Sequence, residues 1–447
     1  MSSGAHEPVS VAEADAVFAD LPRFDRLIAA VSGGSDSMAL LVLIAEWRAR
    51  RGNTGPLISV ATVDHGLRDA SAAEAAFVAE QCARLDLAHA TLNWTGTKPA
   101  RGLAEAARNA RYALLEAHAL SLARTGTGAV LTAHTEDDQA ETFVMRLKRG
   151  AGVDGLAAIP RQRALSTESQ LALVRPLLGI AKTRLIATLQ VRCVPWCEDP
   201  TNTATCYERV RVREALVAFK NAGLESAAIA TSARRMTAAR EALDFATGAF
   251  AATLTLSYNS EVFASFDAQA FARGPQLLRE RVIGQLIRRF GGATPPPELS
   301  EIESLVAQLQ GQTKMATTLG GAVVSAGPRT VRVWREAGRL DAAECVLEPG
   351  VPQLWDNRFW VMVDAACAAR VCVKPLGPEG YRAIAAELKV TKDAPAKAVH
   401  TLPSFWSGMD LLGVPQLGLY GHAKGFKEHL SARPRADVSA PAELPRG

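Results

Sequence analysis

The segment RLIAAVSGGSDS, residues 26–37, joins a short apolar run to a turn rich in glycine and serine. The apolar part predicts a buried strand at 26–32, and residues 38–50 predict a helix directly after the turn. Glycine lets the backbone approach an anion closely, and a helix N-terminus offers free N–H groups and a positive dipole end. We therefore expect a phosphate-binding loop made of Ser32, Gly33, Gly34, Ser35, Asp36 and Ser37. The simpler alternative is a serine N-cap on a glycine-rich turn.

The segments that follow continue the alternation of strand and helix. Further strands are expected at 58–64, 89–94 and 129–134, and helices at 71–85, 103–124 and 137–148. Short apolar strands that alternate with helices are typical of an α/β fold, a parallel twisted sheet with helices on both faces. We expect this Rossmann-like domain at 1–216, a mostly helical second domain at 217–338 that contains a hairpin at 319–336, and a small C-terminal region at 339–447 with short strands.

Composition narrows the class of protein only a little. The chain has 447 residues, 48% hydrophobic and 21% charged, and a formal net charge of +4, which by itself says little about partners. Residues 1–20 lack the basic start and apolar core of a signal peptide, and no apolar run is long enough to span a membrane. The seven cysteines are scattered, as expected for reduced thiols in a cytoplasmic protein.

Two further motifs are expected to lie near the phosphate loop. Asp64, His65 and Arg68 belong to the sequence DHGLR, which ends the second strand. Ligands of open α/β sheets bind outside the carboxyl ends of the strands, so this motif and the loop should edge one cleft. Arg108 and Arg111 lie in ARNARY on the helix at 103–124, where Arg111 is a candidate phosphate ligand. For Arg108, a solvated helix arginine is an equally good interpretation.

A group of carboxylates follows the fourth strand. Asp137, Asp138 and Glu141 lie within the first turns of the next helix, at spacings that place them on neighbouring faces. Acidic residues there also complement the helix dipole, which is the simpler explanation. Three carboxylates so close would repel one another unless a cation joined them, and Mg²⁺ or an ammonium group fits.

Together these blocks resemble the tRNA(Ile)-lysidine synthetase family of the N-type ATP-pyrophosphatase superfamily. The resemblance rests on SGGSDS at 32–37, DHGLR at 64–68, ARNARY at 107–112, AHTEDDQAET at 133–142, RGAGVDGL at 149–156, RPLL at 175–178 and WCEDPTNTATCYERVRVR at 196–213. The loop alone indicates only the superfamily, whereas the acidic block together with residues 196–213 is much more specific. The C-terminal third of the chain resembles the family only weakly.

The resemblance implies a ligase that uses ATP and Mg²⁺. Such enzymes adenylate the 2-carbonyl oxygen of the wobble cytidine in an isoleucine tRNA with a CAU anticodon, and pyrophosphate is released. The amino group of free L-lysine then attacks that carbon, and AMP leaves. The family is cytoplasmic, and whether this chain forms a homodimer is left open.

The resemblance also assigns roles to residues of this chain. The loop residues 32–37 bind ATP together with Asp64, His65 and Arg68, and the candidate Mg²⁺ ligands are Asp36 and Asp137. Asp138 and Glu141 bind the ammonium group of lysine, a task that Asp137 shares if it does not bind metal. Arg111 and either Arg209 or Arg213 hold phosphates or the anticodon backbone.

The arginines at the end of the last motif carry a separate expectation. Because Arg209, Arg211 and Arg213 alternate, we expect them to form one basic edge of an extended strand. A charged edge strand that protects against aggregation is the alternative. Val210 stands where asparagine is expected in many members of the family, which leaves the choice between Arg209 and Arg213 open.

Three other functions compete with this one. A tRNA thiolase of the same superfamily commonly needs paired cysteines, but Cys193 and Cys197 are not spaced as C-x-x-C. A non-catalytic RNA-binding module is opposed by the retained loop and acidic residues. A synthetase of the NAD or GMP type has no support from residues 196–213.

Overall fold

The computed structural model describes residues 7–52, 54–67, 70–99, 101–122, 127–166, 171–198, 207–311, 314–340, 344–367, 369–385, 394–420 and 426–435. The chain divides into two compact units, Met1–Glu241 and Ala242–Gly447. Helix α9 (Ser226–Thr253) contains the boundary. The domain boundaries expected at 216 and 338 stay predictions.

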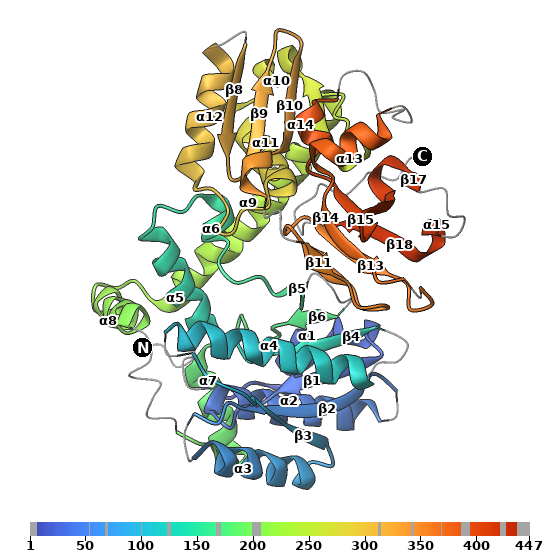
Figure 1. Ribbon diagram of the computed structural model, residues 1–447. Helices are drawn as coiled ribbons and strands as arrows, with labels where there is room; N and C mark the ends of the chain where they lie inside the picture. The colour runs from blue at the N-terminus through green and yellow to red at the C-terminus, as the bar shows by residue number, and fades with distance from the viewer. Residues whose placement is uncertain are drawn as a thin grey trace. The chain divides into compact units, whose positions relative to one another are not determined.

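Unit 1 is built on a six-stranded sheet with the order β3-β2-β1-β4-β6-β5. All neighbouring pairs are parallel except β5 and β6. The strands are β1 (Arg26–Ala30), β2 (Leu57–Asp64), β3 (Ala88–Asn93), β4 (Gly128–Leu131), β5 (Gln162–Ala164) and β6 (Ala172–Val174). The helices are α1 (Val11–Val17), α2 (Ser35–Arg51), α3 (Ala70–Arg84), α4 (Leu103–Leu122), α5 (Glu136–Leu147), α6 (Val153–Leu156), α7 (Lys182–Val191) and α8 (Tyr207–Asn221). The expected α/β fold with a parallel sheet is confirmed (Figure 1).

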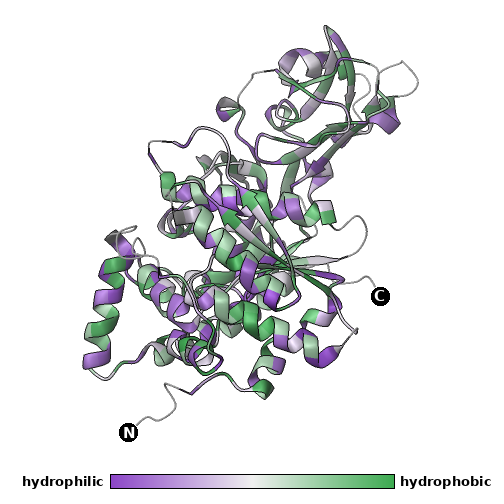
Figure 2. Cartoon of the chain, turned by 90° about the horizontal axis from the view of Figure 1, so that it is seen from below, coloured by the Kyte–Doolittle hydropathy of each residue, from purple (hydrophilic) through white to green (hydrophobic). Residues whose placement is uncertain are grey.

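Both faces of this sheet are covered, as the alternation of side chains along β1 shows. Leu27 and Ala29 join a core with residues of α1, α2, α3 and α7, whereas Ile28 joins a second core with Leu115 and Ala119 of α4. Successive side chains of a strand point to opposite faces, so one short strand serves two cores. Helices in Figure 2 accordingly carry both hydrophobic and hydrophilic residues. The central helix α2 also carries both kinds, but most of its residues are buried.

The register of β1 and β4 positions the turns that follow them. Ala29 of β1 pairs with Leu131 of β4, so the two neighbouring strands end at the same level. The chain leaves β1 to form β2 on one side, while β4 and β6 lie on the other side. This change of direction is a topological switch point, where open α/β sheets bind their ligands. The phosphate loop and the acidic block therefore begin side by side.

The arginines of the last sequence motif lie on a helix and not on a strand. Arg209, Arg211 and Arg213 all belong to α8, so the predicted basic edge of an extended strand is wrong. The prediction of a strand rests only on the alternation of the three arginines. Alternating charges do not show which side chains are buried, so they do not distinguish a strand from a helix. In a helix, the spacing of four residues places Arg209 and Arg213 on one face, and α8 packs that region against α5.

The first part of unit 2 is a four-stranded antiparallel sheet packed against helices. Its strands have the order β7-β10-β9-β8 and form a core with α11 and α12. The elements are β7 (Phe263–Asp267), α10 (Ala268–Arg273), α11 (Gln276–Gly291), α12 (Leu299–Gly311), β8 (Met315–Leu319), β9 (Ala322–Ala326) and β10 (Thr330–Arg335). Strands β9 and β10 are the hairpin expected within residues 319–336, and the helical character of this region is confirmed.

The C-terminal part of unit 2 has a core of its own, between two small sheets. Their strand orders are β11-β14-β15-β16-β17 and β12-β13-β18. The elements are β11 (Cys345–Val346), β12 (Gln353–Trp355), β13 (Phe359–Val363), β14 (Cys372–Pro375), α13 (Gly377–Ile384), α14 (Ala396–Val399), β15 (Pro403–Ser407), β16 (Asp410–Val414), β17 (Leu419–Tyr420), α15 (Phe426–His429) and β18 (Leu430–Pro434). The short strands expected beyond residue 340 are present.

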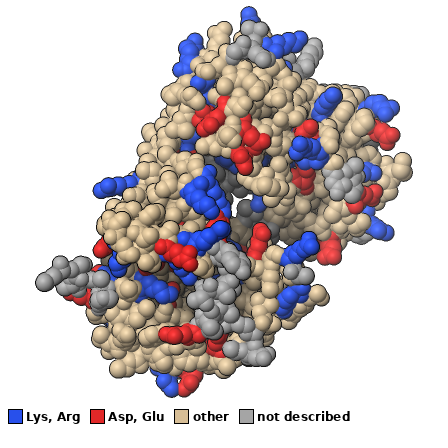
Figure 3. Space-filling view, turned by 90° about the vertical axis from the view of Figure 1, so that its left-hand side faces the viewer, with Lys and Arg blue, Asp and Glu red and all other residues tan. Residues whose placement is uncertain are grey.

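Two observations concern membrane-spanning helices and the charge of one face of the molecule. None of the helices in the described part of the chain is long and apolar enough to cross a membrane. Basic and acidic side chains are interspersed on the face shown in Figure 3, in keeping with the small net charge. The six described cysteines are free thiols, as expected, and Cys206 lies outside the described residues.

We expect Leu41→Ala to lower the free energy of unfolding by about 2–5 kcal/mol, because it leaves a cavity in the core around α2. Leu41 is completely buried there. Urea unfolding followed by circular dichroism measures the change. The matched control is Val191→Ala at the exposed end of α7, which should cost less than about 0.5 kcal/mol. Equal shifts in the two variants would show that the α2 core does not limit stability.

Candidate active site at the carboxyl edge of the sheet

The phosphate loop is held in shape by its own serines. The Ser37 hydroxyl donates to the carbonyl oxygen of Gly34 at 2.9 Å, and it accepts from the backbone N–H of Ser32 at 3.1 Å. Gly34 is the N-cap of α2, and Gly33 has a φ of +90°, which only glycine adopts without strain. The loop thus presents a preformed turn and the free N–H groups of a long helix, as a phosphate site requires.

Part of the last sequence motif covers this loop. The backbone N–H of Cys197 donates to the carbonyl oxygen of Gly33 at 2.9 Å. A Cβ atom on Gly33 would lie 3.4 Å from Sγ of Cys197, so the two backbones approach closely. Trp196 packs against the core beneath α2. The motif at 196–213 therefore contributes a contact to the phosphate loop, although residues 199–206 lie outside the described part.

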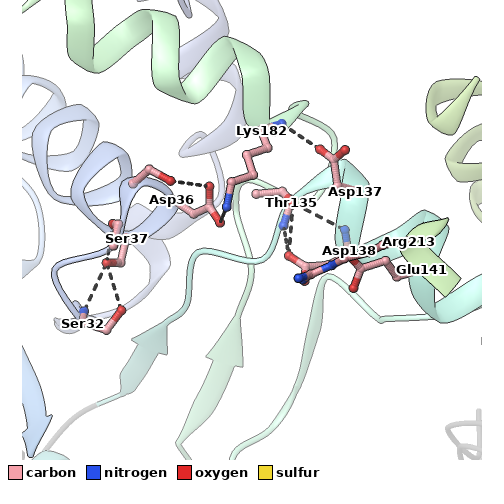
Figure 4. Close-up of polar contacts among 11 residues, drawn as sticks. Ser32, Asp36, Ser37, Thr135, Asp137, Asp138, Glu141, Lys182 and Arg213 are labelled. Atoms are coloured by element: carbon pink, nitrogen blue, oxygen red, sulfur yellow. Dashed lines mark hydrogen bonds and ion pairs between the residues drawn. The ribbon is translucent and has the colours of Figure 1, made fainter. Parts of the chain in front are cut away.

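A lysine that the sequence analysis did not single out joins the loop to the acidic block. Lys182 Nζ lies 3.1 Å from Oδ2 of Asp36, and the backbone N–H of Lys182 donates to Oδ2 of Asp137 at 2.8 Å (Figure 4). Burial raises the pKa of Asp36, and the charge of Lys182 opposes that rise. Lys182 is the first residue of α7, which follows β6 and the RPLL motif. A lysine at the start of a helix that follows a strand of the same sheet lies at the edge where the phosphate loop opens, and this position is the signal by which Lys182 could have been predicted.

Asp138 closes the N-terminus of α5. Its Oδ2 atom accepts from the backbone N–H of Thr135 at 2.8 Å and from the Thr135 hydroxyl at 3.1 Å. The Thr135 hydroxyl in turn accepts from the backbone N–H of Asp138, which completes a capping box. The simpler explanation for an acidic residue here, a cap, therefore holds for one carboxylate oxygen of Asp138. The other oxygen has no partner among the described residues.

Glu141 is paired with the arginines of α8. Its side chain is only 7% exposed, and Oε1 lies 2.6 Å from Nε of Arg213. Oε2 lies 4.0 Å from Nε of Arg209 and has no hydrogen-bond partner among the residues that the structure describes. The nearby carboxylate Glu141, as its hydrogen-bond partner, raises the pKa of Arg213, and Asp138 and Asp137 add to this rise. Both candidate arginines thus face the acidic block.

The residues after β2 form a neighbouring group. Asp64 accepts from the backbone N–H of Gly66 at 2.8 Å and so shapes the turn. Nε2 of His65 lies 3.4 Å from Nη2 of Arg111, and its ring packs edge-on against Trp94. Burial lowers the pKa of His65, and the charge of Arg111 adds to this. Arg111 therefore contacts His65 and not the carboxylates, and Arg68 lies outside the described residues.

His134, at the end of β4, is a second residue that the sequence analysis did not assign. Its Nδ1 atom lies 3.0 Å from the Thr132 hydroxyl. Burial lowers the pKa of His134 to about 4. The charge of Asp138 opposes this fall, and the charges of Arg175 and Arg108 add to it. At neutral pH this imidazole is uncharged, so it can donate or accept a proton in a hydrogen bond without adding charge to the site.

The carboxylates do not form a closed metal cage. Within the described ranges, no group of three or more His, Cys, Asp or Glu side chains converges so as to hold a metal ion. Magnesium that arrives with a nucleotide needs only one or two carboxylates, since phosphates and water complete its coordination. Asp36, whose carboxylate already contacts a cationic group, fits that smaller role.

The chain is similar to several known proteins. Residues 7–219 match the family model described as a PP-loop domain. A tRNA(Ile)-lysidine synthase from Bradyrhizobium is 40% identical over 347 residues, which cover 73% of this chain and 95% of that protein. The protein of the same name from Ruegeria pomeroyi is 38% identical over 417 residues, 91% of each chain. A third tRNA(Ile)-lysidine synthase, from Rhodopseudomonas palustris, is 40% identical over 345 residues, which cover 74% of this chain and 97% of that protein.

We expect Arg213→Gln to lower the free energy of unfolding by about 1–3 kcal/mol, because it leaves the buried Glu141 carboxylate without its hydrogen bond. The double variant Arg213→Gln with Glu141→Gln should recover part of the loss, since no charge then remains unpaired. Chemical denaturation of the wild-type protein, the two single variants and the double variant measures the coupling energy between Arg213 and Glu141. Arg211→Gln on the exposed side of the same helix is the control, and additive single effects would contradict the pairing.

Proposed function

The chain belongs to the tRNA(Ile)-lysidine synthase family, and on that premise we propose that it ligates free L-lysine to an isoleucine tRNA at the expense of ATP. The tRNA carries a CAU anticodon, and the modified atom is C2 of its wobble cytidine. The observation that carries the proposal is the shared edge of β1 and β4, where the phosphate loop and three carboxylates lie side by side.

The proposed reaction has two steps. The cytidine O2 atom attacks the α-phosphorus of ATP, which forms an O–P bond and releases pyrophosphate. A neutral amine of lysine then attacks C2, the C–O bond breaks, AMP leaves and the amine loses a proton. Adenylation is needed because it converts a poor leaving oxygen into a good one. Charge builds on the phosphates in the first step, so fixed N–H donors at the loop favour it.

The phosphate loop is proposed to hold ATP. The free N–H groups at the start of α2 would bind the phosphates, together with the loop that contains Ser32 and Ser37, whose hydroxyls lie 3.3 Å apart (Figure 4). Asp36 would hold Mg²⁺ with the nucleotide phosphates, and Asp137 is the second candidate ligand. When bound, Mg²⁺ would neutralise part of the phosphate charge. Lys182, which contacts Asp36, supplies a positive charge at the same place.

The acidic block is proposed to hold the lysine substrate. One amine must be neutral to attack, and the other, still charged, needs an anionic partner. Asp138 has one oxygen engaged in the cap of α5, and Glu141 has one engaged by Arg213. Within the described ranges, each carboxylate keeps a second oxygen without a hydrogen-bond partner, and the two residues are one helical turn apart. Arg209 at 4.0 Å is the competitor that an incoming ammonium must replace at Glu141.

Arginines and unit 2 are proposed to bind the tRNA. Arg111 and either Arg209 or Arg213 would contact phosphates of the nucleotide or the anticodon. The C-terminal part carries Lys427, Arg433 and Arg435, which suit the RNA backbone, and Lys424 lies outside the described residues. Phosphate contacts of this kind supply much of the affinity for nucleic acids.

The direct test is nucleoside analysis of the product. Unmodified isoleucine tRNA is incubated with the protein, ATP, Mg²⁺ and isotope-labelled lysine, and its nucleosides are examined by mass spectrometry. The proposal requires that the label enter the wobble cytidine. A product that contains sulfur, or no change in the cytidine while ATP is consumed, would reject it.

We expect Asp138→Asn to impair the lysine step more than adenylation. An asparagine keeps an oxygen for the cap of α5 but removes the charge that the ammonium needs. Loss of one charge-assisted hydrogen bond costs about 1.5–3 kcal/mol, or roughly ten- to hundredfold in lysine affinity. Quenched-flow measurement should then detect adenylated tRNA when lysine is limiting.

Thr135→Ser is the control, because it alters the same cap without changing charge. If Asp138→Asn instead slows pyrophosphate release and no adenylated tRNA accumulates, Asp138 serves the nucleotide or the helix cap, and the lysine site must lie elsewhere.

A further inference from the structure

Three arginines surround Tyr112 on the side of the sheet where β5 and β6 lie. Arg108 and Tyr112 belong to α4, Arg163 belongs to β5, and Arg175 directly follows β6. The Cζ atoms of Arg108 and Arg163 each lie 5.3 Å from the centroid of the Tyr112 ring. Such cation–π contacts attract each guanidinium but leave its charge in place. These four residues form the Tyr112 cluster.

Arg175 is the buried member of the cluster. It is only 3% exposed, and its Nη1 atom donates to the carbonyl oxygen of Pro160 at 2.7 Å. Its Nε atom is buried and has no hydrogen-bond partner in the described part of the chain. Burial lowers the pKa of Arg175, Tyr112 opposes this, and the charges of Arg163 and Arg108 lower it further. A cation is therefore held inside the protein beside two others of the same sign.

No carboxylate compensates these charges in the part of the chain that the structure describes. Neither Arg108, Arg163 nor Arg175 has an acidic oxygen within 4.0 Å there, and Arg163 donates instead to the carbonyl oxygens of Ala164 and Leu165. Several other arginines of unit 1, though not all, do have such partners, among them Arg184 with Glu13, Arg192 with Glu46 and Arg213 with Glu141. Buried charges are normally paired, so an unpaired group of three points to an anion from outside.

The cluster lies at the edge of the sheet where the substrates would meet. Arg175 stands at the carboxyl end of β6, next to β4 in the sheet. The charges of Arg175 and Arg108 reach His134 at the end of β4, where they lower the pKa of that histidine. Arg108 is exposed, Arg163 is half-buried and Arg175 is buried, so the positive charge extends from the surface to the interior.

We propose that the Tyr112 cluster binds a phosphate group of a substrate, with Arg175 as the buried anchor and Arg108 and Arg163 as its outer ligands. Guanidinium groups bind phosphate oxygens through paired N–H donors, and a monoanionic or dianionic phosphate would compensate one or two of the three charges. The phosphate belongs either to the RNA backbone or to the nucleotide. The proposal rests on the proposed function, from which both of these substrates come.

The test measures two affinities in each variant. Arg163→Gln and Arg108→Gln are titrated with unmodified isoleucine tRNA at several salt concentrations and, separately, with ATP. If the RNA backbone is bound, tRNA affinity falls about ten- to hundredfold, and the slope of log K against log salt falls by about one per arginine, while ATP affinity is kept. If the nucleotide is bound, ATP affinity falls by the same factor and the tRNA slope is kept.

Arg84→Gln is the matched control, since it removes one positive charge from an exposed pair on α3 in the same unit. Variants that behave like this control with both substrates overturn the proposal. Arg163→Lys keeps the charge without the planar fork, so it should keep most of the salt slope. Loss of both affinities together with thermal stability, with no recovery in Arg163→Lys, would assign the cluster to the fold and also overturn it.

Arg175→Met separates binding from stability. An uncompensated buried cation does not stabilise the free protein, so the methionine should leave the melting temperature unchanged or raise it while it weakens binding. A lower melting temperature with unchanged binding contradicts the anchor role. Because binding is measured without lysine, failure of the cluster is distinct from failure of the proposed ligation, which shows only in the nucleoside analysis.

Discussion

The parallel pairing of β1 with β4 is the constraint on which the rest of the site depends. Because the two strands are neighbours and end at the same level, the turn behind each one opens at the same edge of the sheet. The first turn becomes the phosphate loop, and the second becomes the capped start of α5. A slip of one residue in this register would turn the buried side chains of β1 to the wrong faces. The two cores of unit 1 therefore fix the geometry of the site.

Opposite charges within the protein hold the acidic side of the site together. Asp36 faces Lys182, Asp137 accepts from the start of α7, and Glu141 faces α8. Two of these carboxylates thus contact the start of α7, and the third contacts α8. In a partly buried site such pairs gain strength, and they keep several negative charges close together without metal. A substrate ammonium or a cation that enters must compete with these partners, which favours ligands that bring compensating charge of their own.

Near β5 and β6, the same edge of the sheet has an excess of positive charge. Around Tyr112 there are guanidinium groups with no acidic partner in the described chain, and His134 lies between the two sides as a neutral group. An acidic side suits an amine, and a basic side suits phosphates. This separation of charge across one sheet edge fits a reaction that joins an amino compound to a nucleic acid.

Sequence alone sufficed to predict the first four strands of unit 1, the helices that follow them and the sheet edge at which the site lies. The signals that sufficed are local: apolar runs such as 26–32, the glycines of the loop and the acidic residues after β4. Each of them can be recognised from residues that are neighbours in the sequence. The tertiary structure decided which partner each charged side chain has. Lys182 meets Asp36 across 146 positions of the chain, and Arg213 meets Glu141 across 72, distances at which no periodicity operates. The prediction of a strand from the alternating arginines at 209–213 was wrong for the same reason. The spacing of charged residues does not show which side of a segment is buried. The segment is a helix that packs against α5, and this contact belongs to the tertiary structure.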